Sequence, residues 1–166
     1  MTPAQLRDLV RRDEEAWNAH DSTRLASLVA VNVEFRTVSL SEPIRGRDAF
    51  RQVTERYLRA LPDFRIENRA VAFTDDTVAV EWRVTGTHDA PLLVELRVTG
   101  ARGRLTELPR TGRRVDIPGC SVLRVDAAGL IAAVDEYWNQ ASMLPQLGIR
   151  PFAVGVLRQG LSRLSR

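Results

Sequence analysis

The last strand that the sequence predicts reads LIAAVDEYWN, residues 130–139, and it carries two adjacent carboxylates, Asp135 and Glu136. Successive side chains of a strand point to opposite faces of the sheet. We therefore expect one carboxylate to face water and the other to face whatever the fold encloses. Parity separates the strand into two sets: Ala132, Val134, Glu136 and Trp138 against Ala133, Asp135, Tyr137 and Asn139. Pattern alone favours the first set only slightly as the buried one, because Tyr137 competes with Trp138.

The segments before this strand also read as strands, and turn-forming residues separate them. VAVEWRVT, residues 78–85, alternates apolar and polar side chains, and LLVELRVT, residues 92–99, alternates equally well. FRIENRAVAF (64–73) precedes them, and RRVDIPGCSVLRV (113–125) follows. The second half of the chain is therefore expected to form a run of antiparallel strands.

Helices are predicted in the first half of the chain. Thr2, Pro3 and Gln5 form a helix start, with a hydroxyl at the N-cap, proline at the first helical position and glutamine at the third. HDSTRLASLV (20–29) predicts a second, short helix, capped at Asp21 or Ser22. After a first strand, NVEFRTV (32–38), an amphipathic third helix follows in RDAFRQVTERYLRALP. Helices first and strands afterwards indicate an α+β fold.

Composition restricts the kind of protein. The chain has 166 residues, enough for one domain, and 44% of them are hydrophobic, as in a soluble globular protein. All 24 basic residues are arginine, but they are scattered and often lie beside acids, so we expect no nucleic-acid surface. Cys120 is the single cysteine, and with only two histidines the sequence predicts no metal site and no cofactor.

The sequence also predicts where the protein is located and what its C-terminal tail is. The N-terminal residues show no signal peptide, and no apolar run approaches the roughly 20 residues of a membrane span, so we expect a cytoplasmic protein. The tail, residues 149–166, contains four arginines, no acid and several apolar residues. It is expected to be a basic amphipathic segment that packs on its own domain or on a partner subunit, with a membrane-surface or regulatory contact as the weaker alternative.

Five segments together resemble the SnoaL-like, polyketide cyclase-related branch of the nuclear transport factor 2-like superfamily. The resemblance extends from about residue 5 to residue 148, and it is carried by AWNAHDSTRLASLV, IRGRDAF, VAVEWRVTGTH, TGRRVDIPGCSVLRV and VDEYWNQASMLPQLG. It implies a cone-shaped α+β fold, in which three N-terminal helices close a strongly curved antiparallel sheet around a pocket. It also implies a homodimer.

The chain is expected to divide into one domain and a tail, and one segment of the domain departs from the family. Residues 1–148 are expected to form the α+β cone, and residues 149–166 lie beyond it as the tail. The segment 92–108 is longer than the usual connection after the GTH turn. We expect it to add a hairpin at the pocket mouth or at a dimer surface.

The resemblance identifies the inward carboxylate. The catalytic aspartate of the cyclase and limonene epoxide hydrolase relatives corresponds to Glu136 here, and a pocket histidine of the cyclase corresponds to Ser121. Burial raises the pKa of a carboxyl group toward neutrality, where a general acid or base works best. Glu136 and Ser121 are therefore the candidate catalytic residues. The structural alternatives are that Glu136 pairs with a buried arginine, with Trp17 or with a hydroxyl, and that Ser121 is a small wall residue.

The remaining candidates would contact substrate. Thr37 stands where ketosteroid isomerase has its general base, so that proton-transferring carboxylate is missing. His88, in the GTHDAP turn, is expected at the rim of the pocket or, alternatively, as a solvated loop residue. The other candidate wall residues come from the helices and from the inner faces of the strands: Trp17, Phe35, Thr37, Tyr57, Trp82 and Trp138.

Three functions remain open from the sequence. The first is a small-molecule enzyme of polyketide-like specialised metabolism, of cyclase, isomerase or dehydratase type, using metal-free acid/base chemistry on an apolar substrate. The second is a non-catalytic binder or accessory protein for a lipophilic small molecule. The third is an interaction module that uses the open sheet face and the arginine-rich tail. The superfamily hosts enzymes and binders alike, so the fold does not choose among them.

Overall fold

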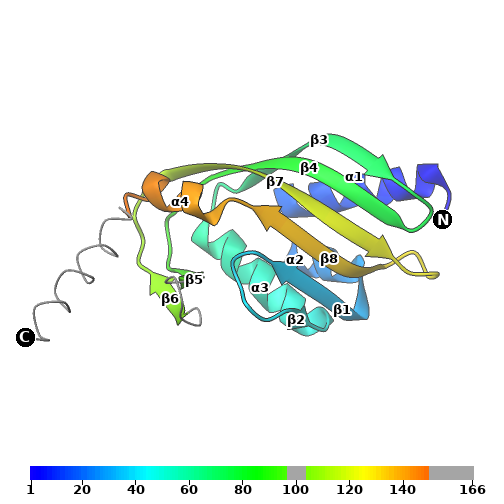
Figure 1. Cartoon of the computed structure of the whole chain (residues 1–166), viewed down its shortest axis with the longest axis horizontal. Helices are drawn as coiled ribbons and strands as arrows, with labels where there is room; N and C mark the ends of the chain where they lie inside the picture. Colours follow the sequence, from blue (N-terminus) through cyan, green and yellow to red (C-terminus); the bar gives the residue numbers. More distant parts are fainter. Residues whose placement is uncertain (97–103, 150–166) are drawn as a thin grey trace, which may run out of the picture.

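The computed structural model describes residues 1–96 and 104–149, and it has the predicted α+β fold (Figure 1). The helices are α1 (Pro3–Asn18), α2 (Ser22–Ser27), α3 (Arg47–Ala60) and α4 (Gln140–Gln146). The strands of the first half are β1 (Val29–Thr37), β2 (Ile44–Arg45), β3 (Arg65–Phe73) and β4 (Thr77–Thr87). They are followed by β5 (Leu92–Leu96), β6 (Arg104–Leu108), β7 (Arg114–Val125) and β8 (Ile131–Trp138).

Six strands form one mixed sheet in the order β2-β1-β8-β7-β4-β3. The expected all-antiparallel sheet is wrong at one position, because β1 and β8 pair in parallel. Parallel neighbours need a long connection between them, and here residues 38–130 separate the two strands. Such a pairing between distant segments leaves no local signal in the sequence.

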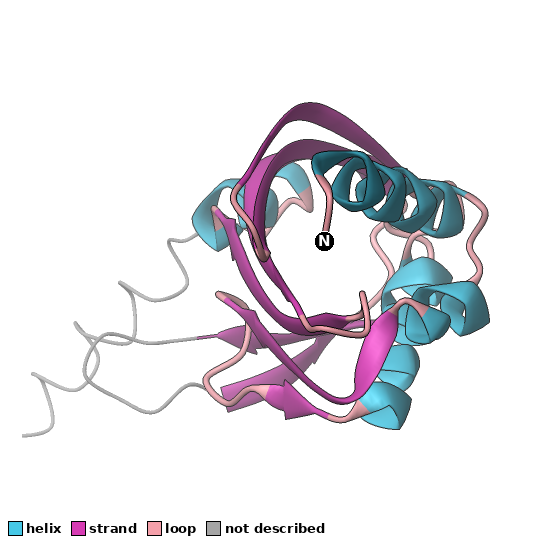
Figure 2. Ribbon diagram, turned by 90° about the vertical axis from the view of Figure 1, so that its right-hand side faces the viewer, coloured by secondary structure: helices cyan, strands magenta, loops and turns pink. Residues whose placement is uncertain are grey.

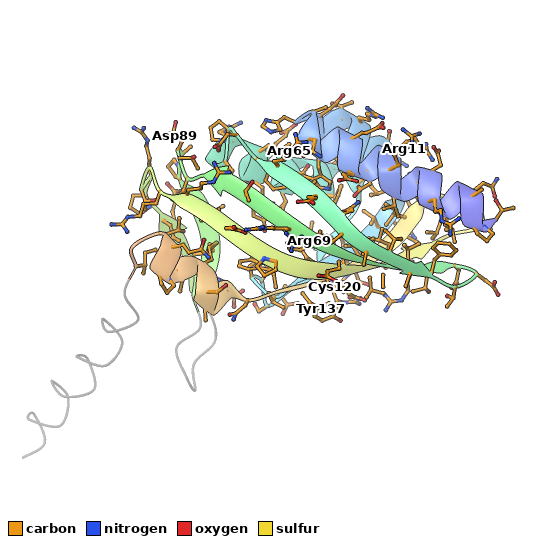
Figure 3. All side chains as sticks on the ribbon, turned by 90° about the horizontal axis from the view of Figure 1, so that it is seen from above. Arg11, Arg65, Arg69, Asp89, Cys120 and Tyr137 are labelled. Carbon is orange, nitrogen blue, oxygen red and sulfur yellow. The ribbon has the colours of Figure 1, made fainter. Side chains whose placement is uncertain are left out.

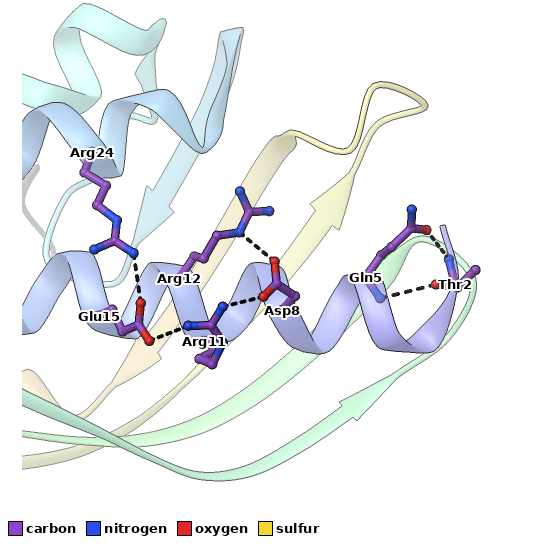
Figure 4. Close-up of polar contacts among 7 residues, drawn as sticks. All are labelled: Thr2, Gln5, Asp8, Arg11, Arg12, Glu15 and Arg24. Carbon is purple, nitrogen blue, oxygen red and sulfur yellow. Dashed lines mark hydrogen bonds and ion pairs between the residues drawn. The ribbon is translucent and has the colours of Figure 1, made fainter.

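The N-terminal helices begin at the predicted caps. The Thr2 side chain accepts a hydrogen bond from the Gln5 amide, and the Gln5 side chain accepts one from the Thr2 amide, which completes a capping box (Figure 4). Asp21 caps α2 by accepting from the Arg24 amide. These side chains satisfy amide groups that a helix leaves unpaired at its start, so the local sequence determines where each helix begins.

The three N-terminal helices lie along one side of the strands, as Figure 2 shows. Helix α1 turns an apolar stripe inward, and its buried residues are Leu6, Leu9, Val10 and Ala16. Charged residues occupy the outer side of the same helix, where Arg11 pairs with Asp8 and Glu15. Burial of the stripe, at roughly 25 cal/mol per Å² of apolar surface, holds the helix on the sheet.

Helix α4 and the β5–β6 hairpin lie at one end of the sheet, on the left of Figure 1. The hairpin is the two-stranded unit that the sequence predicted within residues 92–108, and its connection lies outside the described residues. Helix α4 was not predicted. Asn139 caps it, and the Gln146 side chain bonds both the amide and the carbonyl of Asp116 on β7.

Two further predictions concern the C-terminal tail and membrane-spanning helices. The tail lies outside the described residues, apart from Ile149. Within the described ranges, none of the helices combines the length and the apolarity needed to cross a membrane.

Gly119 is a contact point between two strands of the sheet. It pairs with Trp82 across β7 and β4, and a Cβ atom at this position would overlap the six-membered ring of Trp82. The six-membered ring of the indole therefore lies against the backbone of its neighbour at Gly119. Its position depends on the absence of a side chain at residue 119.

We predict that Gly119→Ala forces Trp82 to move and destabilises the protein by about 1–3 kcal/mol, as overpacked sites do. Denaturant unfolding followed by circular dichroism measures the free energy, and tryptophan fluorescence reports the displaced ring. Unchanged stability together with an unchanged emission spectrum would contradict the packing described here.

Candidate functional site

A cavity of about 140 Å³ lies between the sheet and the helices. An engineered apolar cavity of about 150 Å³ is large enough to bind benzene, so the space suits a ring-sized group. Most of its wall is apolar, and α4 contributes Met143 while β5 contributes Leu92, Leu93 and Val94. The aromatic side chains of the wall are Trp17, Phe35, Phe50, Tyr57, Phe64, Trp82 and Trp138.

Strand register brings the polar wall residues together. Glu136 on β8 lies directly opposite Thr37 on β1 and Ser121 on β7, so the three form one row across neighbouring strands. Residues of one row share a face of the sheet. A second row, two residues further along β8, contains Trp138, Gly119 and Trp82 and faces the same way. On these strands, every second row of paired residues faces the cavity.

The prediction that Glu136 is the inward carboxylate is confirmed, because Glu136 lines the cavity. Asp135 points to the other face of the sheet, where it pairs with Arg124 at 2.8 Å and with Arg36 at 3.4 Å. Asp135 is only 7% exposed, so the expectation that the second carboxylate faces water freely is wrong. The arginine side chains cover it, and the same outer face carries Cys120 and Tyr137 (Figure 3).

Glu136 belongs to a small polar network at the end of the cavity. Burial raises the pKa of its carboxyl group, while hydrogen bonds from Thr37 and Trp138 oppose the rise. The Trp138 indole also donates to the Thr37 hydroxyl at 3.2 Å, and that hydroxyl lies 3.2 Å from the hydroxyl of Ser39. The network explains how a carboxyl group is accommodated between apolar walls. Glu136 also borders a polar groove of about 370 Å³, shared with Thr37.

Tyr57 extends this network from helix α3. Burial and the nearby charge of Glu136 raise the pKa of its phenol to about 12, and the Ser39 hydroxyl opposes the rise. The phenol therefore keeps its proton near neutral pH. It is a hydrogen-bond donor on the cavity wall, within electrostatic range of Glu136.

Ser121 lines the cavity and accepts a hydrogen bond of 2.8 Å from the Trp82 indole. The serine hydroxyl uses an acceptor site for this bond, which leaves its proton available to another group. Trp17, Phe35, Trp82 and Trp138 all line the cavity, as expected. Thr37 is not part of the cavity wall, but its side chain donates a hydrogen bond to Glu136, which is.

His88 does not lie where it was expected. It is fully buried, so the predicted position at an open rim is wrong, and it is absent from the cavity wall. Its Nδ1 lies 3.1 Å from the Thr111 hydroxyl, and burial lowers the pKa of the ring. The turn that contains it packs against residues 111–113, through bonds between the His88 backbone and the backbone of Gly112 and Arg113, and that contact removes the side chain from solvent.

Asp13 is a cavity residue that the sequence did not single out. It follows Val10 and precedes Trp17 on the inward stripe of α1. Burial, with a smaller contribution from the charge of Glu14, raises the pKa of its carboxyl group to about 7. One feature of the sequence could have identified it: the helical spacing of α1 places this acid on the apolar side of the helix. In the part of the chain that the structure describes, no three His, Cys, Asp or Glu side chains are grouped to hold a metal ion.

The chain belongs to a known family. Residues 10–134 match the model of the SnoaL-like domain, which covers most of the chain and ends within β8, before Glu136. A search of curated proteins finds no match.

Solved structures share the fold at low sequence identity. A candidate SnoaL-like polyketide cyclase from Jannaschia sp. CCS1 superposes with a TM-score of 0.73 at 16% identity, over 91% of this chain and 98% of its own. A protein of ketosteroid isomerase-like fold from Catenulispora acidiphila, in complex with trimethylamine, gives 0.67 at 17% identity, with coverages of 90% and 96%. SalBIII, the epoxide hydrolase/cyclase-like enzyme in pyran ring formation in polyether salinomycin, gives 0.64 at 17%, with coverages of 86% and 97%.

The raised pKa of Asp13 predicts a pH-dependent loss of stability. Below the ordinary pKa of 3.8 the carboxyl is protonated in both the folded and the unfolded state, so nothing is lost. Between that value and about 7, the unfolded state ionises and the folded state does not, so stability falls as pH rises, and above about 7 the loss is complete.

We expect Asp13→Asn to remove this loss, with stability matching the parent chain near pH 4 and exceeding it by a few kcal/mol near pH 8, since one pKa unit is worth about 1.4 kcal/mol. Urea unfolding across this range measures the difference. Glu14→Gln is the control for loss of a neighbouring charge: Glu14 is not part of the cavity wall and makes only the smaller contribution to the raised pKa of Asp13, so this variant should recover only a small part of the difference. A constant difference at every pH would contradict the burial of Asp13.

Proposed function

We propose that this protein is a small-molecule enzyme of polyketide-like specialised metabolism, and that Glu136 is its acid/base group. The observation that carries the proposal is a carboxyl group with a raised pKa on the wall of an apolar cavity. A carboxyl group whose pKa lies above its ordinary value is a stronger base than a solvated one, and a group that takes and gives a proton suits cyclase, isomerase and dehydratase chemistry. The cavity would be the closed interior of the cone that the family resemblance implies.

The proposed step is removal of a proton from a carbon next to a carbonyl group. The C–H bond breaks, the proton passes to a Glu136 carboxylate oxygen, and the electron pair moves through the carbonyl carbon onto the carbonyl oxygen. Ser121 and Tyr57 have hydroxyl protons on the same wall, and either is suited to donate a hydrogen bond to that oxygen. The protonated Glu136 then returns its proton to the product or to a leaving oxygen.

Apolar walls contribute to this chemistry by positioning. Holding a flat substrate against the carboxylate converts a rare encounter into a fixed geometry, which supplies several kcal/mol in well-oriented systems. The enzyme-like structural neighbours support the proposal at the level of the fold, because they are described as cyclases or cyclase-like at low identity.

A non-catalytic binding function is the second candidate. It is favoured by the hydrogen bonds that Glu136 receives from Thr37 and Trp138, since a carboxyl group stabilised by the protein can be purely structural. The aromatic wall would bind a lipophilic ligand equally well in that case. The two candidates differ in whether proton transfer occurs inside the cavity.

We predict that the protein opens nitrobenzisoxazole, a flat probe whose ring breaks when a base removes one C–H proton. Glu136→Gln should lower the rate by about a hundredfold or more, the usual contribution of a positioned base. The rate should rise with pH as Glu136 ionises, with a midpoint above its ordinary value of 4.5. Release of the coloured phenolate gives the rate directly.

Asp135→Asn is the matched control, because it removes the same charge from the neighbouring residue on the opposite face. Its rate should stay close to that of the parent chain. Equal rates for the parent chain and Glu136→Gln would contradict catalysis by Glu136 and leave the binding function as the better account.

A further inference from the structure

The carboxyl group of Asp13 has no basic partner on helix α1. Two arginines stand immediately before it, but Arg11 pairs with Asp8 and Glu15, and Arg12 pairs with Asp8. Figure 4 shows these pairs along the outer side of the helix, with Arg24 also directed to Glu15. Asp13 makes no hydrogen bond or ion pair with any residue that the structure describes. Its carboxyl group therefore meets the cavity without a protein partner.

The cavity wall is short of positive charge as a whole. Asp13 and Glu136 are its two acids, and no arginine or histidine stands among the described residues that line it. The arginines lie elsewhere, and on the outer face of the sheet Arg36 and Arg124 pair with Asp135. An isolated carboxylate in an apolar site is costly, and a cation in the site offsets that cost.

Aromatic rings surround the same space. Trp17 lies one helical turn after Asp13 on α1, and its ring centroid is 5.4 Å from that of Phe64. Tyr57, Trp82 and Trp138 face the cavity from α3, β4 and β8. Ring faces attract cations, most strongly where water is excluded. A carboxylate and aromatic rings lining one site are the usual chemistry of ammonium recognition.

We infer that the ligand of this cavity is an apolar molecule bearing a protonated amine, and that Asp13 binds its ammonium group. The inference rests on the proposed function in placing the substrate in this cavity, and it adds the chemical class of that substrate. Asp13 fits the role better than Glu136, because Glu136 already receives hydrogen bonds from Thr37 and Trp138. The pKa of Asp13, raised by burial to about 7, is consistent with a missing counter-charge.

The test compares two ring-sized probes that differ in charge, benzylamine and benzyl alcohol, by calorimetric titration of the full chain at pH 7. We expect benzylamine to bind about tenfold more tightly, because it gains a charge-assisted hydrogen bond and cation–π contacts. Asp13→Asn should abolish this preference while retaining benzyl alcohol binding. Glu14→Gln, one residue further along α1, should keep it.

A second readout uses the parent chain alone and does not depend on a variant that folds. Burial raises the pKa of Asp13 to about 7, so part of the population is protonated near that pH, and an ammonium group that binds the ionised form must release protons. Titrations of benzylamine in two buffers of different ionisation enthalpy measure that release. Benzyl alcohol should release none.

Four results would overturn the inference: no benzylamine binding, equal affinity for the two probes, a preference that survives Asp13→Asn, or binding without proton release. These results are independent of the nitrobenzisoxazole assay. Loss of amine preference with a rate that still depends on Glu136 would reject only the substrate class. Amine binding with a rate independent of Glu136 would reject only catalysis.

Discussion

The placement of β8 between β1 and β7 is the constraint on which the candidate site depends. Its parallel pairing with β1 and its antiparallel pairing with β7 put Glu136 opposite both Thr37 and Ser121. A slip of one residue would exchange the faces of Asp135 and Glu136 and would remove the polar network from the cavity. The register thus fixes at once which carboxylate is enclosed and which hydroxyl groups surround it.

Acidic side chains are paired with arginines on the outer face of this sheet and are unpaired with arginine in the cavity on its inner side. On the outer face, Asp135 is nearly buried but lies between Arg36 and Arg124, so its charge is compensated. On the inner face, Asp13 and Glu136 lie between apolar walls without an arginine among the described lining residues, and burial raises the pKa of both. The same residue type therefore serves as a structural ion-pair partner on one face and as a reactive or ligand-binding group on the other.

The sequence predicted what local patterns encode. Helix caps at Thr2 and Asp21 and the alternation in β4 follow from neighbouring residues, and the family resemblance identified Glu136 where parity was ambiguous. The parallel β1–β8 pair depends on contacts between distant segments, so no local pattern predicts it. Helix α4 was missed although Asn139 caps it, because it has only seven residues and contains Pro145. His88 was misplaced because a turn motif does not show what packs against it. Asp13 stood on a visible apolar stripe, but only the cavity shows that its carboxyl group has no partner.

The central claim is that Glu136 is a desolvated carboxyl group facing the cavity, and the most direct measurement is its own ionisation. Carbon-detected NMR titration of the side-chain carboxyl in the intact protein gives this pKa, with Glu136→Gln identifying the resonance. The structure predicts a value above the ordinary 4.5, because burial outweighs the hydrogen bonds from Thr37 and Trp138. A value at or below 4.5 would mean that Glu136 is solvated or held in an ion pair, and it would contradict the account of this site.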